Sequence, residues 1–209
     1  MAEEIAGYQP PRTWHAGLAA GVIDFASRYR VVFAVAAFAL VAFAVYYYAG
    51  EGEAGNPGAS PYNNFVILGD AVLGGHVEIY DGAALRSYME MDIREGRHYI
   101  IPPPWPAVLM LPGVAVWGRE FDQTLFSAVL GGLTAGLVFL ISRRFSEKLD
   151  TQIWLTVLLV FGTLFWYAAA NGGVWFFSHT VAVSFLFLAI FFTIVRRNPL
   201  AAGLCLGAA

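Results

Sequence analysis

Charged side chains are scarce in this chain of 209 residues: they make up 13% of it, whereas 58% of the residues are hydrophobic. A soluble domain has about a quarter charged residues and roughly half apolar ones. Water is therefore not the only solvent of this protein. The net charge of −3 is small, and the basic residues occur singly or in pairs, which argues against nucleic acid as a partner.

Cysteine is almost absent as well. The single cysteine, Cys205, excludes an internal disulfide and a cysteine metal site, and no residues have zinc-ligand spacing. We predict no metal site from the pattern. The first long apolar run exceeds the hydrophobic region of a signal peptide and lacks a cleavage pattern, so we interpret it as a retained membrane anchor.

Long apolar runs dominate the sequence instead. They lie at residues 31–49, 123–142, 151–170 and 174–195, and a further run occupies residues 199–209. A helix of about 20 apolar residues crosses a hydrocarbon core of about 30 Å. We predict an all-α, polytopic bundle of transmembrane helices, with residues 1–30 as an N-terminal segment and residues 31–209 as the transmembrane domain.

The last run is about half as long as a crossing helix needs to be. We therefore expect this chain to be the N-terminal piece of a longer protein, the alternative being a natural short chain with a half-inserted tail.

Basic residues predict the orientation of the helices. They flank the apolar runs at residues 28–30, 143–148 and 196–197, whereas the polar segment 50–122 holds most of the acidic residues. Lys and Arg concentrate on the cytoplasmic side of membrane proteins. We expect an integral protein of the plasma (inner) membrane with a cytoplasmic N-terminus and an extracytoplasmic loop at 50–122.

The apolar stretch Trp105–Trp117 inside this loop is too short to cross a membrane and is interrupted by Pro112-Gly113. Counting it as a crossing would also place residues 143–148 on the outer side. We predict a helix that lies in the outer interface or dips in and out of it, with its tryptophans at headgroup depth. The remaining loop is predicted to contain a short amphipathic helix at Asp81–Met91 and a polar turn at Arg94–Tyr99.

Asp70 is the acidic residue that most suggests chemistry, because Phe65–Leu73 is otherwise apolar. A buried carboxyl group has a raised pKa and can act as a general base. The alternative is that Asp70 faces water on an interfacial helix. Asp81 belongs to an acidic run that is typical of a solvated surface, although Tyr80-Asp81-Gly82 also fits a turn and a helix N-cap.

Two further groups of polar residues fit a phosphate-bearing substrate. Arg97, His98 and Tyr99 precede a run of three prolines, and a guanidinium can hold a phosphate with two hydrogen bonds. The alternative is contact with lipid headgroups. His179 lies near the start of the run 174–195, where an ionisable residue indicates either a functional site or a structural hydrogen bond.

Together these features resemble the GT-C superfamily of integral-membrane glycosyltransferases, in particular the branch of protein mannosyltransferases and lipid A aminoarabinose transferases. The likeness covers nearly the whole chain and rests on four segments: Phe65–Gly75 (FVILGDAVLGG), His98–Pro112 (HYIIPPPWPAVLMLP), Gly118–Arg144, which ends LVFLISRR, and Val174–Ala189 (VWFFSHTVAVSFLFLA).

The resemblance implies two juxtamembrane helices, at Phe65–Leu73 and Trp105–Trp117, and a polyprenyl-phosphate-sugar donor. The acceptor would be a lipid, a glycan or a protein, and Asp70 and His179 would be the catalytic residues. Asp81, Arg97, His98 and Tyr99 would bind substrate. No cofactor is implied, and a divalent ion stays open. The chain departs from the family at the start of the first juxtamembrane helix, where Pro61-Tyr62-Asn63-Asn64 replaces the usual Asp-Glu pair.

Two other functions fit a polytopic membrane protein. A transporter or flippase of a lipid-linked intermediate requires polar residues deep within several helices, whereas the apolar runs here contain chiefly Ser, Thr and Gly. A non-catalytic membrane scaffold would use the loop to bind another protein.

Overall fold

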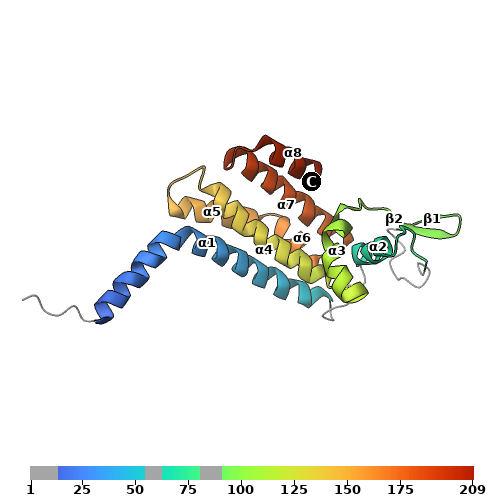
Figure 1. The fold of residues 1–209 in the computed structure, drawn as a ribbon, viewed down its shortest axis with the longest axis horizontal. Coiled ribbons are helices and arrows are strands. Elements are labelled where there is room, and N and C mark those ends of the chain that lie inside the picture. The colour runs from blue at the N-terminus through green and yellow to red at the C-terminus, as the bar shows by residue number, and fades with distance from the viewer. Residues whose placement is uncertain (1–13, 55–62, 81–90) are drawn as a thin grey trace, which may run out of the picture. The chain divides into compact units, whose positions relative to one another are not determined.

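The computed structural model describes residues 14–54, 63–80 and 91–209, and the side chains of residues 29–50, 63–80 and 91–209 (Figure 1). The chain divides into two compact units, Met1–Ala34 and Val35–Ala209, and helix α1 (Trp14–Ala54) contains the boundary between them. The second unit contains all the other elements, which are α2 (Asn64–Leu73), β1 (Met91–Arg94), β2 (Arg97–Ile100), α3 (Trp105–Trp117), the 3-10 turn η3 (Gly118–Glu120), α4 (Gln123–Ser142), α5 (Leu149–Gly162), α6 (Phe165–Asn171), α7 (Val174–Ile194) and α8 (Pro199–Gly207).

Three helices are long and apolar enough to cross a membrane in the part of the chain that the structure describes. They are Tyr29–Gly50 within α1, α4 and α7, and the bent pair α5–α6 would make a fourth. The chain is thus a mostly helical membrane protein, as the apolar runs predict. Helix α3 has only 13 residues and contains Pro112, so it is too short to cross.

Contacts between distant residues fix the directions of the helices in the second unit. The side-chain amide of Gln123 donates to the carbonyl of Gly172 (2.8 Å), and Arg144 donates to the carbonyl of Ile194 (3.4 Å). Helices α4 and α7 therefore run in the same direction, and α5–α6 returns between them. The segments before α4 and before α7 lie at one end, which we call the loop end. Residues 143–148 and 196–198 lie at the other, which we call the arginine end.

The run 151–170 does not form the single continuous helix that the sequence predicts. Helices α5 and α6 meet at an angle of 54°, because Thr163 is extended (φ −122°, ψ 173°). The Thr163 hydroxyl accepts from the backbone N–H of Phe165 (3.2 Å), and the hydroxyl of Tyr46 donates to the carbonyl of Val160 (2.8 Å). These two bonds satisfy polar groups at the break, as a hydrocarbon environment requires.

Small residues let α4 approach α1 closely. A Cβ atom added at Gly132 would lie 2.6 Å from the backbone oxygen of Ala39, and one at Gly136 would lie 3.0 Å from that of Val35. Helices in membranes associate through van der Waals packing that such small residues permit. The ring of Tyr46 in α1 lies against Gly131 of α4. This contact brings the Tyr46 hydroxyl to the break after α5.

The close approach predicts a steric effect at Gly132. Gly132→Ala should lower the free energy of unfolding by roughly 1–3 kcal/mol, because the new methyl group would overlap backbone that cannot move independently. Gly203→Ala in α8 is the matched control, since no atom lies within 4 Å of its added Cβ. Thermal unfolding in detergent measures both, and equal melting temperatures for the two variants would contradict the packing.

Candidate functional site

The polar residues that could bind a substrate lie in the segments that precede α4, which we call the loop layer (residues 63–80 and 91–122). An apolar cluster fixes this layer to the bundle: Phe65 and Val66 of α2, Met110 and Val114 of α3, and Phe177 of α7 are all buried together. Helix α3 reaches along α7, where the ring of Trp105 packs on Phe185 (5.8 Å between centroids). Because Phe185 lies near the middle of α7, α3 extends along the bundle toward its middle. Trp105 therefore does not lie at the loop end, where the predicted headgroup depth would place it.

Asp70 forms an ion pair that the sequence does not reveal. It lies in the last turn of α2, and its Oδ2 accepts a hydrogen bond from Nε of Arg119 in η3 (2.7 Å). The Asp70 side chain is 38% exposed and that of Arg119 is 42% exposed. Asp70 is therefore not the buried lone carboxyl group that its apolar segment suggests, but a half-exposed carboxylate with a guanidinium partner.

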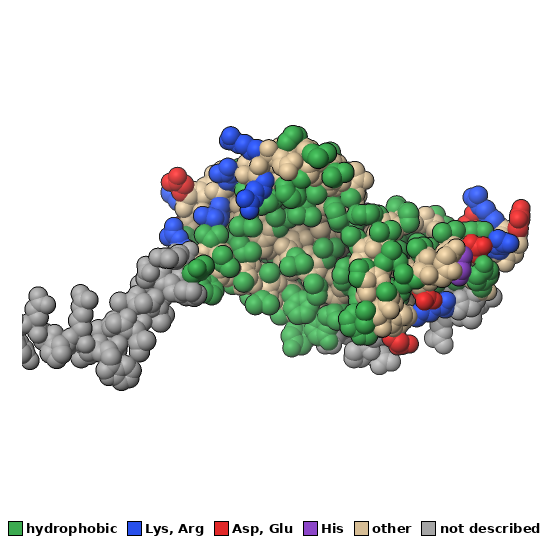
Figure 2. Space-filling model, viewed as in Figure 1, with side chains coloured by type: hydrophobic (Ala, Val, Ile, Leu, Met, Phe, Trp, Pro, Cys, Tyr) green, Lys and Arg blue, Asp and Glu red, His purple; other side chains and the backbone are tan. Residues whose placement is uncertain are grey.

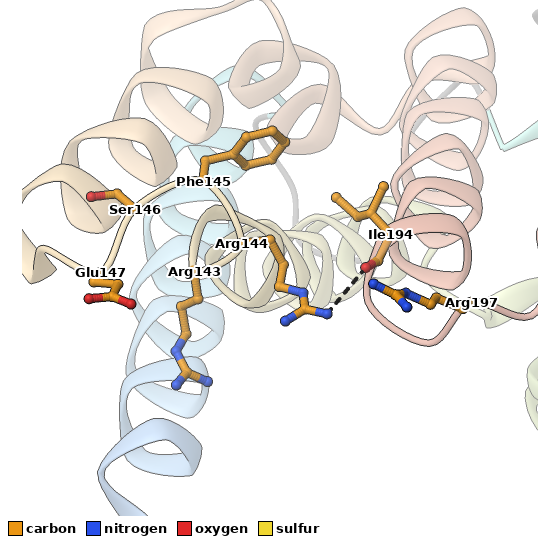
Figure 3. Close-up of a pocket in the computed structure, with 7 residues that line it drawn as sticks. All are labelled: Arg143, Arg144, Phe145, Ser146, Glu147, Ile194 and Arg197. Atoms are coloured by element: carbon orange, nitrogen blue, oxygen red, sulfur yellow. Dashed lines mark hydrogen bonds between the residues drawn. The ribbon is translucent and has the colours of Figure 1, made fainter.

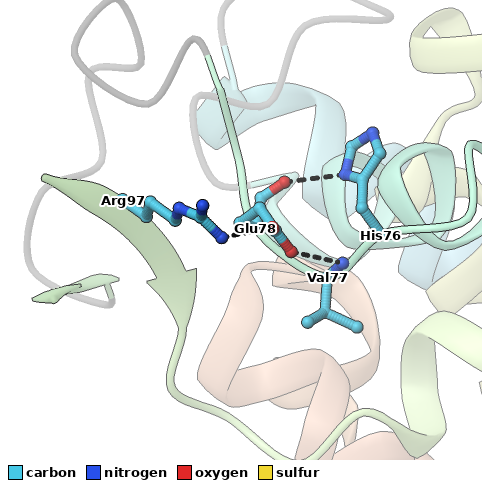
Figure 4. A network of polar contacts seen from close by, with 4 residues as sticks. All are labelled: His76, Val77, Glu78 and Arg97. Atoms are coloured by element: carbon cyan, nitrogen blue, oxygen red, sulfur yellow. Dashed lines mark hydrogen bonds and ion pairs between the residues drawn. The ribbon is translucent and has the colours of Figure 1, made fainter. Parts of the chain in front are cut away.

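A second ion pair joins the turn after α2 to strand β2. Arg97 donates to Oε1 of Glu78 (3.0 Å), with the Arg97 side chain 59% exposed and that of Glu78 17% exposed (Figure 4). Hydrogen bonds from the backbone N–H groups of Glu78 itself and of Val77 lower the pKa of the Glu78 carboxyl group, and the charge of Arg97 lowers it further. His76 Nδ1 lies 2.8 Å from the Glu78 carbonyl oxygen. The sequence analysis, which treats the acidic run as a solvated surface, does not predict this ion pair.

Strands β1 and β2 form a hairpin where the sequence predicts only a polar turn. The two connecting residues, Glu95 and Gly96, both have positive φ (52° and 76°), as the tightest hairpin turns require. His98 accepts at its carbonyl from the N–H of Ile79 (2.8 Å), which ties β2 to the buried Ile79. Met91 begins β1, so the predicted helix Asp81–Met91 does not extend to its last residue, and residues 81–90 lie outside the described part.

Tyr99 lines a cavity of about 580 Å³ on the hairpin, together with Asp92 and Arg94. Asp92 and Arg94 form a third ion pair (2.7 Å), and the Asp92 carboxylate raises the pKa of Arg94. Figure 2 shows the result as mixed acidic and basic side chains over the hairpin. Tyr99 therefore lies in the same hollow as this ion pair.

The structure does not bring the proposed residues into one cleft. On α7, Phe177 and Val181 are buried against the loop layer, whereas His179 is exposed. A residue two positions from Phe177 lies on the opposite side of a helix, so His179 faces away from Asp70. Asp81 lies outside the described residues. The described residues place the other candidates in separate groupings: Asp70 with Arg119, Arg97 with Glu78, and Tyr99 beside Asp92 and Arg94.

Metal binding has no visible site in this layer. Among the described residues, no group of three or more His, Cys, Asp or Glu side chains could hold a metal ion. The ion pairs also occupy Asp70, Glu78 and Asp92 with arginine partners.

Comparison with known proteins adds no relative. No family model, no curated protein and no solved structure matches this chain.

The lowered pKa of Glu78 predicts that the hairpin loosens in acid. A carboxyl group whose pKa falls on folding stabilises the folded state above its ordinary value of 4.5, and this contribution is lost as the pH falls through the lowered value. Hydrogen exchange of the Ile79 amide, corrected for intrinsic rate, should show protection that is constant near neutral pH and drops a few-fold in acid. Glu78→Gln should lose this pH dependence, whereas the control Glu120→Gln should keep it. A pH-independent protection in the unsubstituted protein would contradict the prediction.

Proposed function

We propose that this chain is part of a membrane glycosyltransferase that moves a sugar from a polyprenyl-phosphate donor to a lipid, glycan or protein acceptor at the extracytoplasmic face. The observation that carries the proposal is the Asp70–Arg119 pair (2.7 Å), which lies where α2 meets η3 above an apolar cluster shared with α7. A charged pair held against a helix bundle suits a substrate with a polar reacting centre and an apolar tail. The GT-C resemblance of Phe65–Gly75 and His98–Pro112 supports the same class.

In the proposed reaction the acceptor hydroxyl or amine attacks the anomeric carbon of the sugar. A new bond forms to that carbon, the bond from carbon to phosphate oxygen breaks, and the polyprenyl phosphate leaves with the electron pair. The acceptor proton passes to the Asp70 carboxylate as general base. Arg119 holds that carboxylate in one orientation, and direct attack inverts the configuration at the anomeric carbon.

The leaving phosphate requires a cation, and we assign this role to Arg97. Because Arg97 and Asp70 belong to separate ion pairs, the bound donor would have to extend from one pair to the other. Glu78 engages one terminal nitrogen of Arg97 (3.0 Å) while the side chain stays 59% exposed. A guanidinium carries five N–H donors, so the others stay available for phosphate oxygens. Fixing the guanidinium in advance lowers the entropic cost of gripping the phosphate as its charge develops. His98 and Tyr99 follow on the same strand and would contact the sugar-phosphate.

The polar side chains inside the helices fit a transporter of a lipid-linked intermediate less well than they fit a transferase. The hydroxyl groups of Thr156, Thr180 and Ser184 donate to carbonyls one turn back in their own helices (2.6–3.0 Å), and Thr134 and Ser184 are 2.7 Å apart. These hydroxyls bond within their own helices or, for Thr134 and Ser184, between α4 and α7, so they do not line a path for a polar substrate.

The catalytic role is tested by Asp70→Asn, which keeps the size of the side chain and removes the base. We expect turnover of a radiolabelled polyprenyl-phosphate sugar by the whole protein in its membrane to fall by about 10²–10⁴-fold, the usual contribution of a general base. Asp92→Asn is the matched control, because it also breaks an ion pair of an exposed aspartate in the loop layer. Undiminished turnover in Asp70→Asn at equal expression would remove Asp70 from the mechanism.

The proposed orientation is tested by labelling in intact cells. In a Cys205→Ser background, Glu120→Cys at the loop end should react with a membrane-impermeant maleimide, whereas Glu147→Cys at the arginine end should react only after permeabilisation. Both positions are exposed glutamates, so side-chain access is comparable. The reverse pattern would place the loop layer in the cytoplasm and contradict the use of an extracytoplasmic donor.

A further inference from the structure

A cavity of about 590 Å³ opens at the arginine end, between the segment after α4 and the end of α7 (Figure 3). Three arginines line it, Arg143, Arg144 and Arg197, together with Glu147, Phe145 and Ile194. Figure 2 shows basic side chains gathered at this end of the bundle. The loop layer described above is at the other end, so this cavity is a separate site.

The described residues do not balance the charges in this cavity. None of the three arginines forms an ion pair with a carboxylate in residues 29–50, 63–80 or 91–209. Arg144 donates one hydrogen bond, to the carbonyl of Ile194 (3.4 Å), and its other donors stay available. With three guanidinium groups and one carboxylate in its lining, the cavity favours an anion, and planar guanidinium groups match the oxygens of a phosphate.

Two features hold the arginines in place. The side-chain amide of Gln152, which is buried, donates to the carbonyl of Ser146 (2.8 Å) and fixes the turn that carries Arg143 and Arg144. On the other side, Arg197 has a left-handed backbone (φ 52°), and the N–H of Asn198 after it donates to the carbonyl of Phe192 (2.8 Å). Glycine is the usual residue at such a helix end. An arginine there costs conformational free energy, which a role for its side chain would explain.

The lining also indicates an amphiphile. Phe145 is 70% exposed and borders the same cavity as the arginines. The membrane-length helices α4 and α7 end at Ser142 and Ile194, directly before these residues. A cavity at this level would meet lipid headgroups, and basic pockets between transmembrane helices are suited to anionic ones.

We propose that this cavity binds the phosphate of an anionic phospholipid, with the headgroup among Arg143, Arg144 and Arg197 and the glycerol end against Phe145. The site does not depend on the proposed transferase activity. It requires only that α4 and α7 cross the membrane.

The full chain in neutral detergent can be titrated with dioctanoyl phosphatidylglycerol, dioctanoyl phosphatidylcholine and inorganic phosphate, with tryptophan fluorescence or thermal shift as the readout. We expect saturable binding of phosphatidylglycerol that exceeds that of phosphatidylcholine. Arg143→Gln and Arg197→Gly should each weaken it about fivefold, the effect of one basic residue near an anionic headgroup.

Arg196→Gln is the matched control. It removes the same charge from the neighbouring residue, whose guanidinium lies over the ring of Phe191 (6.0 Å) and does not line the cavity. It should leave binding within twofold. Arg197→Gly separates binding from folding, because glycine relieves the left-handed backbone and should leave the melting temperature unchanged or higher while affinity falls.

The outcomes separate the possible ligands. Saturation by inorganic phosphate as strong as that by phosphatidylglycerol, with the same dependence on Arg143 and Arg197, would support a phosphate site but overturn the lipid as its ligand. Equal binding of the two lipids, or an equal loss in Arg196→Gln, would overturn the site itself.

Discussion

The hydrogen bond from Tyr46 to Val160 is the interaction on which the arrangement of the second unit most depends. The extended backbone at Thr163 removes the helical donor that would otherwise reach the Val160 carbonyl, and an unsatisfied carbonyl in hydrocarbon costs several kcal/mol. Tyr46 can supply the bond because Gly131 leaves room for its ring. The break, the glycine surface of α4 and the tyrosine of α1 are therefore one coupled feature.

The break in turn determines where the loop layer attaches. Because α6 departs from α5 by 54°, its last turn brings Gly172 against Thr124 and within reach of the Gln123 amide (2.8 Å). This contact aligns the starts of α4 and α7, and the start of α7 carries Phe177, on which α2 and α3 pack. The Asp70–Arg119 pair thus lies above the apolar cluster of α2, α3 and α7, and the position of this platform depends on the break deep in the bundle.

The sequence predicts helices better than it predicts contacts. Length and apolar composition were enough to find α1, α4 and α7, because a membrane-crossing helix needs only a long run of one residue class. The break at Thr163 could not be predicted, since it depends on a hydroxyl of Tyr46 more than a hundred residues away in the chain. The hairpin had a weak local signal in Glu95-Gly96. The partners of Asp70 and Arg97 had none, because ion pairs between distant residues leave no spacing pattern.

Among the described residues, charged side chains form ion pairs at the loop end of the bundle and none in the cavity at the arginine end. In the loop layer Asp70, Glu78 and Asp92 each have an arginine partner, so these three charges are partly compensated and oriented. At the arginine end the cations that line the cavity have no carboxylate partner among the described residues. An ion pair holds a side chain in the orientation that a reaction needs, whereas an unpaired cation attracts the anion that is abundant at that depth in the membrane. If the bundle crosses a membrane, that anion is lipid phosphate, and binding it would fix the depth of α4 and α7. The platform under Asp70 would then be anchored from the opposite side of the membrane.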